Sequence, residues 1–175
     1  VIANPNAPTS IGRGLDFIRE ILDNNRDSVV IVDEAYVDFG GESAVPLLNE
    51  YENLVVTQTF SKSRSMAGMR IGCAFGNEEI ISALYAAKDS YNSYPMDSVA
   101  IAAGVASVAD EEYFRATVAK VIATRDRLSA ALREMGFTLP DSCTNFVFAQ
   151  HSRYRAKDIC EHLKTRDIYV RYFSK

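Results

Sequence analysis

The chain has 175 residues, of which 47% are apolar and 24% charged, and its net charge at pH 7 is −4. This apolar content argues against a disordered chain, and the scattered lysines and arginines lack the basic stripe of a nucleic-acid-binding surface. The longest apolar runs fall well short of the roughly 20 residues that a membrane-spanning helix needs. Three widely spaced cysteines without a C-x-x-C pair indicate reduced thiols in a cytoplasmic protein.

Short β-rich runs alternate with helical periodicity in the first part of the chain. The β-branched run at 28–32 is typical of a parallel strand that is covered on both faces. Strands are predicted at 1–3, 28–32, 54–60 and 69–75, and helices at 14–23 and 78–88, the latter with Ile80, Ile81 and Leu84 inward. This alternation predicts an α/β fold with a mostly parallel sheet flanked by helices.

The second part is predicted to be mainly helical. Helices are expected at 97–108, 112–135 and 156–166, one or two strands within 137–150, and a final strand at 168–172. Gly136 stands where a helix commonly stops. We therefore predict two domains, 1–112 and a small α+β part at 113–175, with their boundary inside the long helix. The chain lacks an initiating Met and starts within an apparent strand, so we expect it to be a piece of a longer protein.

Residues with useful chemistry are concentrated where the β-rich runs end. They are Asn6, Asp33, Tyr36, Thr59, Ser61, Lys62 and Arg70. Ligands bind at the carboxyl ends of strands in open α/β sheets, so this set predicts a site at one sheet edge. Each residue also has an ordinary structural interpretation: a helix cap for Asp33, a core ring for Tyr36, turn residues for the serines and surface charges for Lys62 and Arg70.

Other kinds of site find less support. Cys160 and His162 supply two ligands, too few for a zinc site, and we predict no metal. The sequence contains no Walker loop, no G-x-G-x-x-G motif and no G-x-S-x-G elbow. Pyridoxal 5′-phosphate (PLP) needs an amine for its aldehyde, an acid for its ring nitrogen and hydrogen-bond donors for its phosphate. The residues at the strand ends supply such groups: a lysine, an acid, a phenol, hydroxyls and an arginine.

Three blocks of sequence closely resemble the histidinol-phosphate aminotransferases, which are fold-type I PLP-dependent enzymes. The blocks are Asn4-Pro5-Asn6-Ala7-Pro8-Thr9, Asp33-Glu34-Ala35-Tyr36 and Ser61-Lys62 with Ala67-Gly68-Met69-Arg70-Ile71-Gly72. The resemblance covers essentially the whole chain and implies part of the fold-type I architecture.

The resemblance also implies a role for each residue. Lys62 would be the Schiff-base lysine and proton shuttle, Asp33 the partner of the ring nitrogen, and Tyr36 a hydrogen-bond donor to the phenolic oxygen. Thr59, Ser61 and Arg70 would hold the cofactor phosphate, and Arg171 the substrate phosphate.

Two departures from the family pattern affect these expectations. Ala7 stands where the family usually has the asparagine that donates to the phenolic oxygen, and Asn6 lies one residue earlier. Members of the family are also considerably longer. We therefore expect weak PLP binding and little or no turnover from these 175 residues alone.

The resemblance implies transamination of histidinol phosphate with a 2-oxo acid such as 2-oxoglutarate, in histidine biosynthesis, by a cytoplasmic homodimer. Three alternatives stay open: an aromatic aminotransferase, a decarboxylase of a phosphorylated amino acid, and a non-catalytic or regulatory fragment. A purely structural α/β domain would not need the set of residues at the strand ends.

Overall fold

The computed structural model describes residues 1–174 and contains a four-stranded sheet of order β1-β2-β3-β4. The strands are β1 (Ile2–Ala3), β2 (Val30–Asp33), β3 (Leu54–Thr59) and β4 (Gly72–Phe75). The first three strands are parallel, and β4 runs antiparallel to β3. The predicted α/β fold with a mostly parallel sheet is confirmed.

The hydrophobic core lies between this sheet and α1 (Leu15–Asp23). Ile18 and Leu22 stand four residues apart on the same helix face, so both side chains face the sheet. They are fully buried together with Val32, Leu54 and Val56 of the two central strands. The β-branched runs that predicted β2 and β3 thus supply the core.

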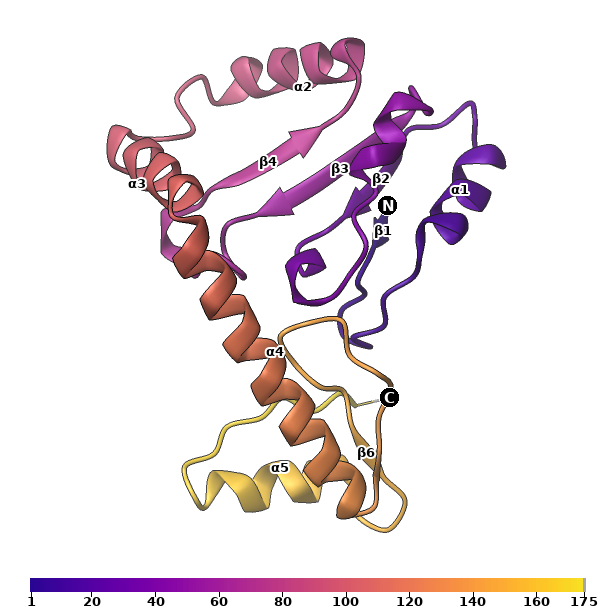
Figure 1. The fold of residues 1–175 in the computed structure, drawn as a ribbon, viewed down its shortest axis with the longest axis vertical. Helices are drawn as coiled ribbons and strands as arrows, with labels where there is room; N and C mark the ends of the chain where they lie inside the picture. The colour runs from indigo at the N-terminus through magenta and orange to yellow at the C-terminus, as the bar shows by residue number, and fades with distance from the viewer. Residues whose placement is uncertain (175) are drawn as a thin grey trace.

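The remaining helices are α2 (Glu78–Tyr91), α3 (Ser98–Ala109), α4 (Glu111–Glu134) and α5 (Ala156–Lys164). Asn77, Asp97 and Asp110 cap the first three, each accepting a backbone N–H three residues later. Gly136, with a φ of +87°, follows the end of α4 as predicted. The long α4 runs from the large sheet to the part that holds α5 and the two-stranded sheet of β5 (Phe137–Thr138) and β6 (Gln150–His151) (Figure 1).

Two expectations for secondary structure were wrong. Residues 168–172 do not form a strand, because no described strand pairs with them and the Val170 carbonyl instead accepts the Cys160 thiol hydrogen. The strand expected at 69–75 begins only at Gly72, because a short 3₁₀ helix (Ala67–Met69) and a left-handed Arg70 precede it.

Helices α2 and α3 leave apolar side chains in solvent. Leu84, which was expected to face inward, is 45% exposed, so that expectation was wrong. Val99, Ile101, Val105 and Val108 of α3 are each at least half exposed. Ile101, Val105 and Val108 share one face of α3 at helical spacing, and this face is largely exposed among residues 1–174. None of the described helices is long and apolar enough to span a membrane.

Candidate functional site

The carboxyl ends of β1, β2 and β3 meet at one edge of the large sheet. Ala3 pairs with Asp33, and Asp33 pairs with Thr57, so the residues after the three strands leave the sheet side by side. Asp33, Tyr36, Thr59, Ser61 and Lys62 follow or end these strands. The structure therefore gathers these five at one edge, and the roles given to them stay predictions.

Asp33 and Tyr36 stand on the segment that follows β2. Asp33 is half-buried, and its Oδ1 accepts the N–H of Ala35 at 3.1 Å. The half-buried ring of Tyr36 packs edge-on against Phe146, with ring centres 5.2 Å apart. The Nζ of Lys62 lies 5.5 Å from the centre of the Tyr36 ring. The phenol and the lysine amine are therefore neighbours, although 26 positions separate them in sequence.

Lys62 combines an exposed amine with a fixed backbone. Within residues 1–174 its amine makes no ion pair and no hydrogen bond. On one side, Thr59 Oγ1 donates to Ser61 Oγ at 3.0 Å and accepts the Ser61 N–H at 3.1 Å. On the other side, the buried Ser63 donates its hydroxyl hydrogen to Asp38. An amine held in this way can attack a carbonyl carbon.

Arg70 reaches the same edge because β4 is antiparallel. Gly72 of β4 pairs with Thr59, so the residues just before β4 lie at the carboxyl end of β3. Arg70 has a φ of +56°, in the left-handed region that arginine rarely adopts, and its Nη1 donates to the Ala67 carbonyl at 2.9 Å. Strained backbone of this kind clusters at functional sites. The guanidinium is exposed and free to bind an anion.

The side chain of Asn6 is already engaged within its own loop. Its Oδ1 accepts the Thr9 hydroxyl hydrogen at 2.7 Å and the Thr9 N–H at 3.4 Å. Asn6 follows β1 and therefore lies at the same sheet edge as Asp33 and Lys62. Its side-chain Oδ1, however, is used to stabilise its own turn. Ala7, next to it, is exposed and carries no polar group.

Within the described chain, Arg171 makes no hydrogen bond or ion pair with the residues at the sheet edge. It is exposed, and within residues 1–174 it makes no hydrogen bond or ion pair. Its segment packs beside α5, through Cys160 and the Val170 carbonyl, and Phe173 contacts Phe148. The structure therefore does not join Arg171 to the strand-end residues.

Glu34 is a buried residue beside the site that the sequence analysis did not select. It is 2% exposed, and its carboxylate accepts hydrogen bonds from the Ser43 hydroxyl and the Gln58 amide, both at 2.8 Å, and from the Ala44 N–H. Strand alternation turns it to the face opposite Asp33, and this signal could have identified it. Glu34 thus ties the segment carrying Asp33 and Tyr36 to β3.

Replacing Glu34 by alanine is expected to lower the free energy of unfolding of the full-length protein by about 3 kcal/mol, because three donors, among them the buried Ala44 N–H, lose their acceptor. Glu34→Gln keeps one acceptor oxygen and should cost about half as much. Urea unfolding measures both. The exposed Glu52→Ala is the control, with an expected change within about 0.5 kcal/mol. A Glu34→Ala protein as stable as the control would contradict this assignment.

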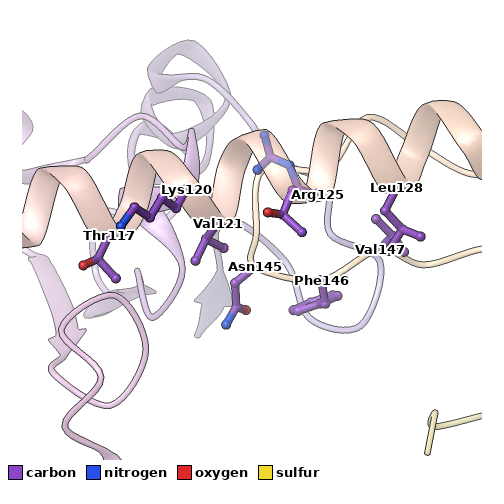
Figure 2. Close-up of a pocket in the computed structure, with 9 residues that line it drawn as sticks. Thr117, Lys120, Val121, Arg125, Leu128, Asn145, Phe146 and Val147 are labelled. Atoms are coloured by element: carbon purple, nitrogen blue, oxygen red, sulfur yellow. The ribbon is translucent and has the colours of Figure 1, made fainter. Parts of the chain in front are cut away.

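A groove of about 330 Å³ borders the site. Figure 2 shows that side chains of α4 and of the segment 145–147 line it, among them Lys120, Asn145 and Phe146. Phe146 also contacts Tyr36, so the groove adjoins the sheet edge. Arg125 of α4 joins the two parts of the chain, since its Nη1 donates to the Phe39 carbonyl at 2.6 Å and to the Thr144 carbonyl at 3.0 Å.

Thiol and metal chemistry have little support at this edge. Burial raises the pKa of Cys73 on β4. At neutral pH this group therefore stays a protonated thiol, which is less nucleophilic than a thiolate. Among residues 1–174, no three histidine, cysteine or acidic side chains lie close enough together to hold a metal ion. The lysine amine is therefore the better candidate nucleophile.

Comparison with known proteins shows similarity along the whole chain. The family model described as aminotransferase class I and II matches residues 1–175. A histidinol-phosphate aminotransferase from Lactococcus lactis subsp. cremoris (strain SK11) is 53% identical over 175 residues, which are 100% of this chain and 49% of that protein.

Two solved structures have a similar fold. The histidinol-phosphate aminotransferase from Clostridium acetobutylicum matches 97% of this chain and 52% of its own, with a TM-score of 0.86 and 25% identity. The enzyme of that name from Sinorhizobium meliloti, in complex with pyridoxal-5′-phosphate, matches 97% of this chain and 47% of its own, with a TM-score of 0.84 and 26% identity. The resemblance and the fold-type I architecture that it implied are confirmed, and the chain spans about half the length of these relatives.

Proposed function

Because this chain belongs to the aminotransferase class I and II family, we propose that the longer protein transfers the amino group of histidinol phosphate to a 2-oxo acid such as 2-oxoglutarate. One observation supports this proposal most strongly: the Lys62 amine, which is unpaired within residues 1–174, lies 5.5 Å from the centre of the Tyr36 ring, at the edge where Asp33 ends its strand. The similarity to histidinol-phosphate aminotransferases along all 175 residues supports this choice of substrate.

The residues at the sheet edge fit PLP by their chemistry. The cofactor carries an aldehyde, a basic ring nitrogen, a phenolic oxygen and a phosphate. The edge offers one amine, one carboxylate, one phenol, two hydroxyls and one guanidinium. When bound, PLP withdraws electrons from the substrate Cα and so makes the bonds at that carbon easier to break.

Each of these residues then has a defined task. Lys62 Nζ would bind the aldehyde carbon and, once the substrate amine has displaced it, would take up the proton that leaves the substrate Cα. The carboxylate of Asp33 would hold a proton at the ring nitrogen, because a nearby negative charge favours the protonated form. The hydroxyl of Tyr36 would donate a hydrogen bond to the phenolic oxygen.

The phosphate group would be bound by Thr59, Ser61 and Arg70. Hydroxyls donate single hydrogen bonds, and the guanidinium can bind in bidentate fashion. Asn6 would also lie near the cofactor, although its Oδ1 is occupied by Thr9. We further propose that Arg171 contacts the substrate phosphate in the complete protein. Its exposed guanidinium suits an anion.

We propose that the chain divides as the sequence predicts, with 1–112 in the large cofactor-binding domain and 113–175 in the small domain. The four-stranded sheet lies within the first range, the two-stranded sheet and α5 lie within the second, and α4 begins at the boundary. We also propose a cytoplasmic homodimer. The exposed apolar residues of α3 support further protein contacts, and the three unpaired cysteines suit a reducing compartment.

The test uses the full-length protein. Addition of PLP should produce a visible absorbance band, and borohydride reduction followed by peptide mapping should place the label on Lys62. Histidinol phosphate and 2-oxoglutarate should then yield glutamate. A label spread over surface lysines would refute the proposed site. Turnover of aromatic amino acids alone, or release of CO₂ from a phosphorylated amino acid, would replace the proposed reaction by one of its alternatives.

A further inference from the structure

Ser63, directly after Lys62, joins the lysine segment to the tyrosine segment. Its side chain is 5% exposed and donates its hydroxyl hydrogen to Oδ2 of Asp38. Asp38 lies two residues after Tyr36, in the short 3₁₀ helix Val37–Phe39. Among residues 1–174 this is the one side-chain hydrogen bond between segments 36–39 and 61–65.

Each of these segments is also held from another direction. The 3₁₀ helix is fixed by the Val37 N–H, which donates to the Glu34 carbonyl, and by Arg125, which donates to the Phe39 carbonyl. The lysine segment is fixed through Arg64, whose guanidinium donates to the Ser107 carbonyl at 2.6 Å and lies 4.1 Å from the centre of the Phe114 ring. These contacts anchor each segment to its own surroundings. Beyond the paired strands β2 and β3 that precede the two segments, the hydrogen bond between Ser63 and Asp38 links the segments directly to each other.

We propose that the hydrogen bond from Ser63 to Asp38 positions the Lys62 amine against the Tyr36 ring. Ser63 and Asp38 are thus positioning residues that act through Lys62 and Tyr36, and this inference rests on the function proposed above for those two residues. A bond made by a buried hydroxyl to a carboxylate is charge-assisted and stronger than a neutral one. It can therefore hold an otherwise unpaired lysine in one place.

Three single variants of the full-length protein separate positioning from charge. Ser63→Ala removes the donor and leaves the Asp38 charge. Asp38→Ala removes both the acceptor and the charge. Asp38→Asn removes the charge but keeps an oxygen that can accept the Ser63 hydrogen. A positioning role predicts that Ser63→Ala and Asp38→Ala behave alike and that Asp38→Asn stays close to wild type. A charge effect predicts instead that the two Asp38 variants behave alike.

The first readout is the pH at the midpoint of the visible absorbance change of the PLP-loaded protein. This midpoint reports the protonation of Lys62 Nζ when that atom is bonded to PLP. It depends on where Nζ lies relative to the Tyr36 ring. Ser63→Ala and Asp38→Ala should shift it in the same direction by about half a pH unit or more, and Asp38→Asn by less than about 0.2 unit. A merely structural bond would lower the temperature of unfolding without moving this midpoint.

The second readout is amide hydrogen exchange of the cofactor-free protein. Exchange should accelerate in both segments, 36–39 and 61–65, in Ser63→Ala and Asp38→Ala, and should stay at the wild-type rate in Asp38→Asn. Unchanged exchange in the segment that does not carry the substitution would overturn the proposal.

The two proposals fail in different ways. A wild-type protein that forms no absorbance band with PLP would refute the proposed function, and the positioning role with it. If the wild-type protein forms the band, and Ser63→Ala and Asp38→Ala both keep the wild-type pH midpoint, the positioning role alone is refuted.

Discussion

Turnover of the full-length protein is expected to fall by at least about 10³-fold when Lys62 is replaced by alanine, because general acid–base catalysis by this group is lost together with its bond to the cofactor. The visible absorbance band that PLP forms with the protein should disappear as well. Lys62 is exposed and makes no ion pair within the described chain, so the temperature of unfolding of the cofactor-free variant should stay within a degree or so of that of the cofactor-free wild type. Steady-state kinetics, absorbance and thermal unfolding measure the three effects.

A matched control for this variant is Lys157→Ala. Lys157 is also exposed, and it lies on α5, 3.8 Å from Glu161. Such a surface pair contributes little, so this variant should keep the turnover and the band of the wild type. A Lys62→Ala protein that keeps more than about a tenth of wild-type turnover would remove Lys62 from the proposed chemistry, since the loss of a nucleophile is much larger than that.

Asp33→Asn is expected to lower turnover by about 10²-fold or more while the protein still binds PLP. Asparagine has the shape of aspartate and keeps an oxygen for the Ala35 N–H. It lacks the negative charge that would hold a proton at the ring nitrogen, and the cofactor without that proton withdraws electrons less well. The expected signature is therefore a lower kcat with a label that borohydride still places on Lys62.

Asp141→Asn serves as the control for Asp33→Asn. The side chain of Asp141 is 98% exposed and pairs with Arg133 at the surface, so its neutralisation should leave kcat unchanged. Wild-type kcat in Asp33→Asn would show that the Asp33 charge takes no part in the reaction. Loss of the Lys62 label in this variant would instead show that Asp33 is needed to form the site.

The sequence predicted the parts of the fold in which local pattern and burial agree. The β-branched run at 28–32 predicted a buried strand, and β2 forms with Val30 and Val32 in the core. Prediction failed where the outcome depended on a distant partner. Residues 168–172 have the composition of a strand, but no sheet edge in the described chain pairs with them. Leu84 has the spacing of an inward residue, but among the described residues its side chain stays 45% exposed.

The residues of the candidate site also divide into those that a local pattern predicts and those that depend on a distant partner. Asp33, Tyr36 and Lys62 could be selected because each follows or ends a strand-forming run. Glu34 also directly follows β2, and strand alternation could have identified it. The bond between Ser63 and Asp38 could not be found in this way, because it depends on a contact between segments 25 residues apart. Arg171 was selected from a short motif, and within residues 1–174 it makes no hydrogen bond or ion pair with the strand-end residues.

By itself, the sequence determined the chemical groups of this protein, the order of its strands and helices as far as α5, and its resemblance to a family of PLP-dependent aminotransferases. Only the tertiary structure decided which groups lie together. It placed Arg70 at the carboxyl end of β3 by running β4 antiparallel, and it brought the Lys62 amine over the Tyr36 ring. Hydrophobic periodicity records which side of a segment is buried. The direction of a strand and the contacts between its ends are set by how the whole chain packs, and no local pattern records them.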